Sequence, residues 1–155
     1  MKKNIILILF LFCKCDCDGG CYMSFYNNSG KPVCYLIPLR YGIFYPDTSL
    51  PELPIEYIIT SIVNKESHGS LSYHTNQLFP NLSSIDTISI FFFCPDTLSK
   101  YEWETIRKEY KILMRYDFSY TDFQKLNWEV YYPPTEVMKD MKMFPPYQEK
   151  IDDTD

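Results

Sequence analysis

Histidine and glycine are scarce in this sequence, whose 155 residues include two histidines and five glycines. Histidine is the usual acid or base near neutral pH and the commonest metal ligand, and glycine-rich loops let a backbone cradle phosphate groups. No serine lies between the glycines of a nucleophile elbow. We therefore predict no catalytic residue, no metal site and no cofactor.

Positive charge is not concentrated in any part of the chain, and the formal net charge is -5. Binding to nucleic acid requires a basic patch, so we do not predict it. Apolar residues make up 46% of the sequence and aromatic residues 17%. This composition is sufficient for the packed core of one domain and is too apolar for a disordered chain.

The first residues have the pattern of an export signal. Lys2 and Lys3 precede an uncharged apolar run over residues 5–12. A transmembrane helix needs about 20 apolar residues, whereas a short run after positive charges is typical of a signal peptide. We predict a signal peptide over residues 1–14, followed by a flexible linker over residues 15–20.

Cysteines are concentrated directly after the apolar run, at Cys13, Cys15, Cys17 and Cys21. A bacterial lipoprotein signal is cut before a cysteine that then carries acyl chains, so Cys13 and Cys15 are the candidates for lipidation. Neither follows the small residue that this cleavage prefers, because Phe12 and Lys14 precede them. Distance from the apolar run favours Cys13, while cleavage before Cys15 leaves an even number of thiols for disulfides.

Two other interpretations of this cysteine cluster stay open. The spacing lacks the paired Cys-x2-Cys motifs of common zinc folds, so a metal site is less favoured than an anchor. A disulfide between Cys17 and Cys21 is compatible with the intervening Gly19 and Gly20. The lipid-anchor interpretation predicts attachment to the bacterial envelope, most simply at the outer membrane.

The middle of the chain has the pattern of short strands separated by turns. The turn Asn27-Asn28-Ser29-Gly30 predicts a hairpin between the first two strands. Residues 38–54 contain four prolines and predict a long loop. Strands are expected at residues 21–26, 32–37, 55–63, 70–73 and 86–93. The last of these has an apolar second half, as a central strand requires.

Helical patterns follow this strand. Ser99 and Glu102 match a capping box and predict a helix over residues 100–110. Trp103, Ile106 and Tyr110 then share one face of that helix.

A second capping box, Ser119 with Asp122, predicts another short helix flanked by the staple residues Phe118 and Phe123. Further strands are expected at residues 111–116 and 127–132. In the latter, Trp128, Val130 and Tyr132 occupy the alternate positions of a buried face.

These elements predict a single mostly-β domain over residues 21–134, with two short helices in its C-terminal half. We expect a β-sandwich, with an α+β layered fold as the alternative. Residues 135–155 are expected to form a partly disordered C-terminal tail. Its apolar residues are candidates for docking on the domain: Val137, Met138, Met141, Met143 and Phe144.

The stretch "DTISIFFFCPDTLSKYEWETIRKEYKILMRYDFSYTDFQKLNWEVYYPPTEVMKDMKMFPPY" resembles a family of small uncharacterised lipoproteins from Bacteroides-type bacteria. The segments "FYNNSGKPVCYLI" and "YPDTSLP" resemble the same family. The resemblance implies export to the envelope and a mostly-β domain. It implies no activity and no catalytic residue.

Two histidines and two cysteines are the candidates for a metal site and a disulfide. His68 and His74, with Glu66, have the spacing of metal ligands, but surface histidines are the simpler interpretation. Cys34 and Cys94 adjoin apolar strands, where they are either buried apolar side chains or partners in a disulfide.

Glu102 and Glu104 form a carboxylate pair of the kind used by glycosidases, but helix capping and solvation explain them. Exposed aromatic rings can bind sugars, and the candidates are Tyr41, Phe44 and Tyr45 in the proline-rich loop. We therefore predict a non-enzymatic interaction or structural lipoprotein of the envelope with a protein or glycan partner. The alternative is a carbohydrate-binding module presented on the cell surface.

Overall fold

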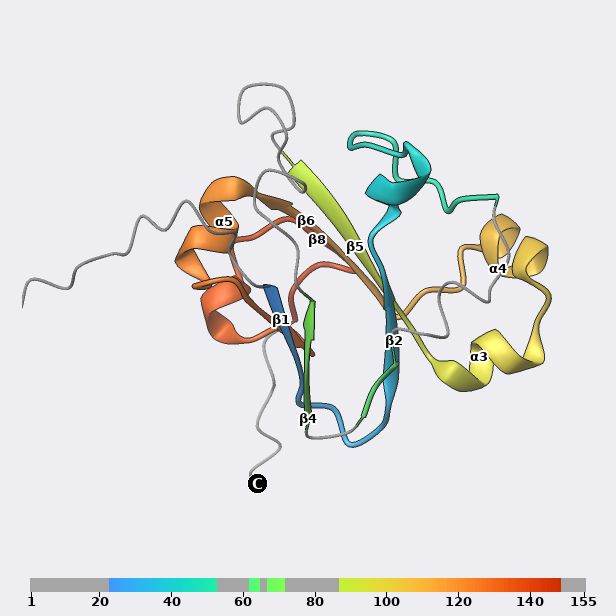
Figure 1. The fold of residues 1–155 in the computed structure, drawn as a ribbon, viewed down its shortest axis with the longest axis horizontal. Coiled ribbons are helices and arrows are strands. Elements are labelled where there is room, and N and C mark those ends of the chain that lie inside the picture. The colour runs from blue at the N-terminus through green and yellow to red at the C-terminus, as the bar shows by residue number, and fades with distance from the viewer. Residues whose placement is uncertain (1–22, 53–61, 65–66, 72–86, 149–155) are drawn as a thin grey trace, which may run out of the picture.

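The computed structural model describes residues 23–52, 62–64, 67–71 and 87–148, whose strands form two sheets (Figure 1). The strands are β1 (Met23–Asn27), β2 (Val33–Leu36), β3 (Ile62–Val63), β4 (Ser67–Leu71), β5 (Thr87–Phe93), β6 (Met114–Ser119), β7 (Glu129–Tyr132) and β8 (Met143–Phe144). The helices are α3 (Pro95–Lys100), α4 (Trp103–Glu109) and α5 (Tyr120–Lys125), with short 3-10 helices η1 (Pro38–Tyr41) and η2 (Glu136–Met138). Within this part of the chain, no helix is long and apolar enough to cross a membrane.

Strand β5 is central in the larger sheet, whose order is β3-β2-β5-β6-β8 with antiparallel neighbours throughout. All its residues from Ile88 to Phe93 are buried. The prediction of a central strand over residues 86–93 is therefore confirmed for its described part. Successive side chains of a strand point to opposite faces, so both faces of β5 must be covered.

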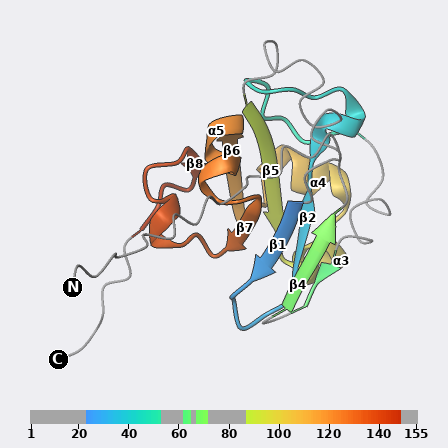
Figure 2. The same cartoon turned by 60° about the vertical axis from the view of Figure 1, so that its left-hand side comes forward.

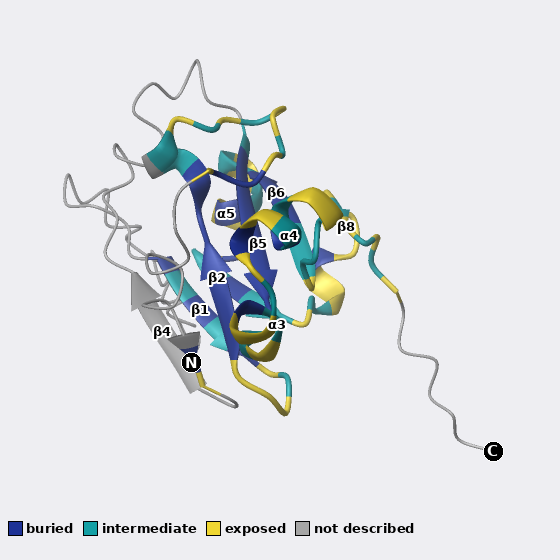
Figure 3. Cartoon of the chain, turned by 90° about the vertical axis from the view of Figure 1, so that its right-hand side faces the viewer, coloured by how far each residue is buried: buried dark blue, intermediate teal, exposed yellow. Residues whose placement is uncertain are grey.

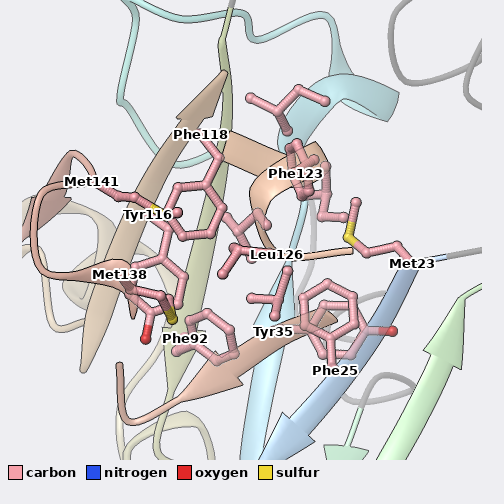
Figure 4. Packing of buried hydrophobic residues seen from close by; sticks show 14 of the residues in the cluster. Met23, Phe25, Tyr35, Phe92, Tyr116, Phe118, Phe123, Leu126, Met138 and Met141 are labelled. Carbon is pink, nitrogen blue, oxygen red and sulfur yellow. The ribbon is translucent and has the colours of Figure 1, made fainter. Parts of the chain in front are cut away.

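One face of β5 packs toward the smaller sheet, whose order is β4-β1-β7 (Figure 4). The ring of Phe25 from β1 stacks on Tyr35 from β2, with the centroids 4.1 Å apart. Phe92 from β5 meets Phe25 edge-on at 6.2 Å. This aromatic cluster is the main core, and it joins the two sheets by apolar burial.

The opposite face of β5 is covered by α3 and α4 (Figure 3). Phe93 meets Trp103 edge-on at 5.9 Å, and Ile106 is fully buried beside them. The predicted shared face of Trp103, Ile106 and Tyr110 is thus confirmed, with Tyr110 half-buried at its end. The alternation along β5 divides its phenylalanines between two separate cores.

The predicted hairpin between the first two strands is wrong. Strand β1 pairs with β4 and, in parallel, with β7, whereas β2 joins the larger sheet. The turn itself forms, because the Asn27 side-chain oxygen accepts a hydrogen bond from the Ser29 amide at 3.0 Å. The buried Asn27 amide nitrogen also donates to the carbonyls of Lys31 and Val63, at 2.8 and 3.0 Å. These bonds link the turn to β3, in the larger sheet.

The predicted capping box of Ser99 and Glu102 is also wrong. The helix expected over residues 100–110 is confirmed in part as α4, which spans Trp103–Glu109. Helix α3, which precedes it, was not predicted, although Pro95 occupies its first turn, a position that proline favours. Ser99 lies inside α3, where its hydroxyl donates to the Asp96 carbonyl at 3.0 Å. Glu102 is the N-cap of α4 and makes no side-chain cap bond.

The second predicted capping box is confirmed. The Ser119 hydroxyl accepts from the Asp122 amide at 3.2 Å, and the Asp122 carboxylate accepts from the Ser119 amide at 2.9 Å. The flanking rings of Phe118 and Phe123 meet edge-on at 5.6 Å. Helix α5 therefore begins where local sequence signals place it.

Strand β7 begins at Glu129, two residues later than predicted, because Asn127 and Trp128 have positive φ angles of 51° and 65°. Val130 is fully buried, and the predicted companions Trp128 and Tyr132 are partly buried against the same core.

The expected tail also differs from the prediction, because residues 135–148 contain η2 and β8 and belong to the folded unit. Met138 and Met141 are buried, and β8 extends the larger sheet beside β6. Of the remaining docking candidates, Met143 packs partly on the main core, while Val137 and Phe144 are 67% and 48% exposed. The domain therefore continues past residue 134.

The described chain is an α+β structure, in which helices cover one face of the larger sheet. The expectation of a mostly-β fold holds only in part, since three α-helices accompany the strands. The predicted strands at residues 55–63, 70–73 and 111–116 overlap β3, β4 and β6 in part. The parts of the first two that do not overlap β3 and β4 lie outside the described residues.

Candidate functional site

Helix α4 holds an irregular segment of the proline-rich loop by three side-chain hydrogen bonds. Trp103 donates to the carbonyl of Pro51 at 2.8 Å, and Arg107 donates to that of Leu50 at 3.0 Å. One turn further along, the Tyr110 hydroxyl donates to the Thr48 carbonyl at 3.0 Å. A loop without regular structure is thereby fixed to a helix, because three of its backbone carbonyls have side-chain partners.

An open depression of about 710 Å³ lies between this loop and α4. Its lining residues are Pro46, Asp47, Thr48, Ser49, Leu50, Glu104, Arg107, Lys108 and Tyr110. Arg107 contacts both Glu104, at 2.9 Å, and the exposed Glu52, at 3.6 Å. The Ser49 amide donates to the Asp47 carboxylate, which lowers the pKa of that carboxyl. The depression therefore carries charges of both signs.

The three aromatic candidates of this loop have different surroundings. Tyr41 packs against the core beneath α3 and α4. The ammonium of Lys142 donates to the Tyr45 hydroxyl and lies 4.4 Å from the centroid of its ring. Phe44 is 45% exposed. The loop therefore presents one open ring, and not the coplanar set that a sugar-binding platform requires.

A further exposed ring, Phe144, lies beside the same depression. It meets Tyr110 edge-on at 6.2 Å, and the guanidinium carbon of Arg115 is 5.6 Å from its centroid. Arg115 also donates to the Tyr110 hydroxyl at 2.6 Å. The contacts of Tyr45 and Tyr110 thus bring the loop and the residues around β8 to one surface. We call Phe44, Tyr45, Lys142 and Phe144 the aromatic rim.

Arg115 connects this surface to a buried polar cluster. Its guanidinium donates to the Asp117 carboxylate at 3.1 Å, and the Ser89 hydroxyl donates to the same carboxylate at 2.7 Å. The Asp117 side chain is completely buried and Ser89 is 3% exposed. Because Ser89 is covered and its proton is held by a weak base, the geometry favours a structural role for the cluster over nucleophilic catalysis.

Sequence analysis missed this cluster, although a signal was present. In β6, Arg115, Asp117 and Ser119 alternate with the apolar Met114, Tyr116 and Phe118. Such alternation places the polar residues on one face. The cluster forms because β5, the neighbouring strand, carries Ser89 opposite Asp117.

Another polar group lies on the outer face of the smaller sheet. The Glu129 carboxylate accepts from the hydroxyl of Tyr131 at 2.5 Å and from that of Tyr26 at 3.4 Å. The two rings stack with centroids 5.0 Å apart and an interplanar angle of 17°. We call these three residues the tyrosine–glutamate cluster. Sequence analysis did not single it out.

The described cysteines are free thiols, so of the two alternatives for Cys34 and Cys94 the disulfide is wrong. Cys34 is a buried apolar side chain in the core beneath α3 and α4. Burial is the main cause that raises its pKa to about 11, and proximity to Cys94 adds to it. A nucleophilic cysteine needs a lowered pKa, so Cys34 is not suited to that role.

The remaining candidates are placed as follows. The predicted lipidation residues Cys13 and Cys15 lie outside the described residues, as do Cys17, Cys21, Glu66 and His74. His68 lies in β4, in register with Tyr26. Glu104 forms the ion pair with Arg107, and Glu102 occupies the N-cap position of α4 without a side-chain cap bond.

No group of three His, Cys, Asp or Glu side chains that could hold a metal ion is found among the described residues.

A second depression, of about 730 Å³, separates the two Pro-Pro segments of the C-terminal region. Pro133, Pro134, Pro145, Pro146 and Tyr147 supply much of its lining, and Glu136 contributes a carboxylate. No interaction in the described residues identifies a ligand for it.

No family model, curated protein or solved structure matches this sequence or its fold.

Proposed function

We propose that this protein is an exported, lipid-anchored, non-catalytic binding protein of the bacterial envelope. The anchor is supported by the two lysines, the short apolar run and the cysteines that follow it. The family resemblance supports the same location. The binding function is supported by the surface around α4.

One observation carries the binding function: a rigidly held loop presents an exposed aromatic ring on the protein surface. Three side-chain bonds fix residues 48–51 to α4, and the Tyr45–Lys142 contact fixes the preceding turn to the C-terminal region. Exposed Phe44 and Phe144 then belong to one pre-organised surface. Rigid aromatic anchors lose little conformational entropy on binding, as recognition loops require.

A binding role is favoured over catalysis because the buried polar side chains already have hydrogen-bond partners. Among the described residues, every buried side-chain nitrogen and oxygen has a hydrogen-bond partner. Active sites commonly keep titratable groups poised in a pocket with shifted pKa values. The depression beside α4 is open, and its Arg107 and Glu104 are paired with one another.

The anchor is tested by intact mass and N-terminal peptide mapping of the protein from its native membrane fraction. We expect an acylated Cys13 or Cys15 at the mature N-terminus. An unmodified Met1 with free thiols in the soluble fraction would contradict export. It would also favour the metal interpretation of the N-terminal cysteines.

The binding surface is tested by photo-cross-linking in cells, with a photoreactive phenylalanine at position 44 or 144. We expect both positions to yield the same discrete cross-linked species. Position 137 is the matched control, because Val137 is 67% exposed and lies outside the aromatic rim. Equal cross-linking from all three positions would show that the rim has no particular role.

Carbohydrate binding is the second candidate, and exposed Phe44 is the observation that favours it. Under this hypothesis, tryptophan fluorescence or ring NMR signals respond to oligosaccharides, and Phe44→Ala abolishes the response. A protein partner predicts cross-linking without such a response.

A further inference from the structure

The tyrosine–glutamate cluster is produced by strand pairing in the smaller sheet (Figure 2). Strands β1 and β7 are parallel, with Tyr26 in register with Tyr131. Their neighbours Phe25 and Val130 point into the main core and are buried. Because strand side chains alternate, Tyr26, Glu129 and Tyr131 share the other face of these strands, and Tyr131 also packs in part against the main core.

With these hydrogen bonds made, the Glu129 carboxylate and the Tyr131 hydroxyl oxygen can only accept further bonds. Each tyrosine hydroxyl has one proton, and both protons are directed at the Glu129 carboxylate. The phenolic oxygens, the carboxylate oxygens and the π-faces of the rings are all electron-rich. A complementary ligand must therefore supply donors or positive charge.

The charge of Glu129 is also uncompensated within the described chain. By contrast, the buried Asp117 has the cation Arg115, and the exposed Glu104 has Arg107. The contacts of Glu129 are with the two tyrosines, and no described Lys or Arg pairs with it. The hydrogen bond with Glu129 is the first cause that raises the pKa of Tyr131 to about 12, and coulombic repulsion by Glu129 contributes.

We propose that the tyrosine–glutamate cluster binds the side chain of an arginine or lysine of a partner protein. An arginine is the better fit, because a planar guanidinium can donate two bonds to the carboxylate and stack on a tyrosine ring. This inference rests on the proposed binding function and adds the chemistry of the partner. The cluster is a second contact surface, on a different sheet from the aromatic rim.

The test titrates the full-length protein with a blocked arginine tetrapeptide and follows binding by calorimetry. The citrulline tetrapeptide is the ligand control, since citrulline is nearly isosteric with arginine and uncharged. We expect the arginine peptide to bind and the citrulline peptide not to bind. Binding should weaken as ionic strength rises.

Variants of the protein separate the cluster from general charge effects. Glu129→Gln should weaken binding of the arginine peptide about ten-fold, as expected when a charged contact is removed. Glu52→Gln removes the same charge at a site that is 89% exposed on the α4 side of the molecule, and should change the affinity by less than about two-fold. Tyr131→Phe should retain much of the binding and Tyr131→Ala should not. Circular dichroism confirms that each variant is folded.

Equal effects of Glu129→Gln and Glu52→Gln would overturn the inference, because binding would then reflect net charge alone. Binding of chitotetraose in place of the arginine peptide would also overturn it and would favour a glycan. If photo-cross-linking at position 44 succeeds while the peptide test fails, the binding function stands and this inference does not. If cross-linking fails while the peptide binds as described, the tyrosine–glutamate cluster is retained as a cation-binding site and the aromatic rim is rejected as a binding surface.

Discussion

Two carboxylates of this protein, Asp117 and Glu129, differ in what surrounds them. Asp117 is completely buried and has both a guanidinium and a serine hydroxyl as partners. Glu129 lies on the outer face of a sheet and is partly exposed, and within the described part of the chain its partners are two neutral hydroxyl donors. A charge that is buried and paired serves the fold, whereas a charge held in place without a counter-ion can bind a cation.

Removal of Asp117 should have the largest effect on stability. Asp117→Ala leaves Arg115 without its ion-pair partner and Ser89 without its acceptor, so we expect a loss of about 3 kcal/mol in the free energy of unfolding. Denaturant unfolding followed by circular dichroism measures this loss. A loss below about 1 kcal/mol would indicate that water already shares the cluster.

Removal of the serine hydroxyl should have an intermediate effect. Ser89→Ala deletes one hydrogen bond to a buried carboxylate, and we expect a loss of about 1.5 kcal/mol. Ser99→Ala is the matched control, because the Ser99 hydroxyl is exposed and bonds only within α3. Similar losses in the two variants would contradict the importance of burial.

Removal of the Glu129 charge should have little effect on stability. Glu129→Gln keeps an acceptor for Tyr131 on a solvent-facing surface, and we expect a change within about 0.5 kcal/mol. The same unfolding measurement applies. A loss as large as that of Asp117→Ala would show that Glu129 is also a structural carboxylate.

The ionisation of Tyr131 gives a pH test of the same contrast. Its pKa is raised from 10.0 to about 12, chiefly by the hydrogen bond with Glu129 and then by burial. The neutral hydroxyl is thus favoured in the folded state, and this stabilisation is present below pH 10 and is lost as the pH rises through about 12. Ultraviolet titration of tyrosinate should show that Glu129→Gln moves the titration of Tyr131 toward lower pH. An unchanged titration curve would contradict the role of Glu129.

Local sequence signals predicted the elements that local interactions determine. Helix α5 begins directly after its N-cap Ser119, because Ser119 and Asp122 bond reciprocally. The Asp122 amide donates to the Ser119 hydroxyl, and the Ser119 amide donates to the Asp122 carboxylate. Strand β5 is apolar on both faces in its second half, and this predicts a central strand whichever strands pair with it. The predicted helix over residues 100–110 began too early because Ser99 and Glu102 also match a capping box, and α3 was missed because the prediction overlooked the signal of Pro95.

Sheet membership could not be predicted in this way. The Asn27 turn has hairpin chemistry, yet the strands on either side belong to different sheets. The sheet that each strand joins depends on long-range contacts. Asn27 donates to the carbonyl of the distant Val63, and Phe25 of one sheet stacks on Tyr35 of the other. Contacts of this kind are set by packing and not by neighbours in sequence.

Composition, hydrophobic period and capping act locally, so the amino-acid sequence was enough to predict an apolar core, a central strand at residues 86–93 and a helix after Ser119. Three features follow from the tertiary fold. Asp117 contacts Arg115 and Ser89, and α4 holds the proline-rich loop. Tyr26, Glu129 and Tyr131 share one face of the smaller sheet. Each of these depends on strand order or on long-range side-chain contacts. Alternation along a strand such as β6 shows which residues share a face, but not which distant strand pairs beside them.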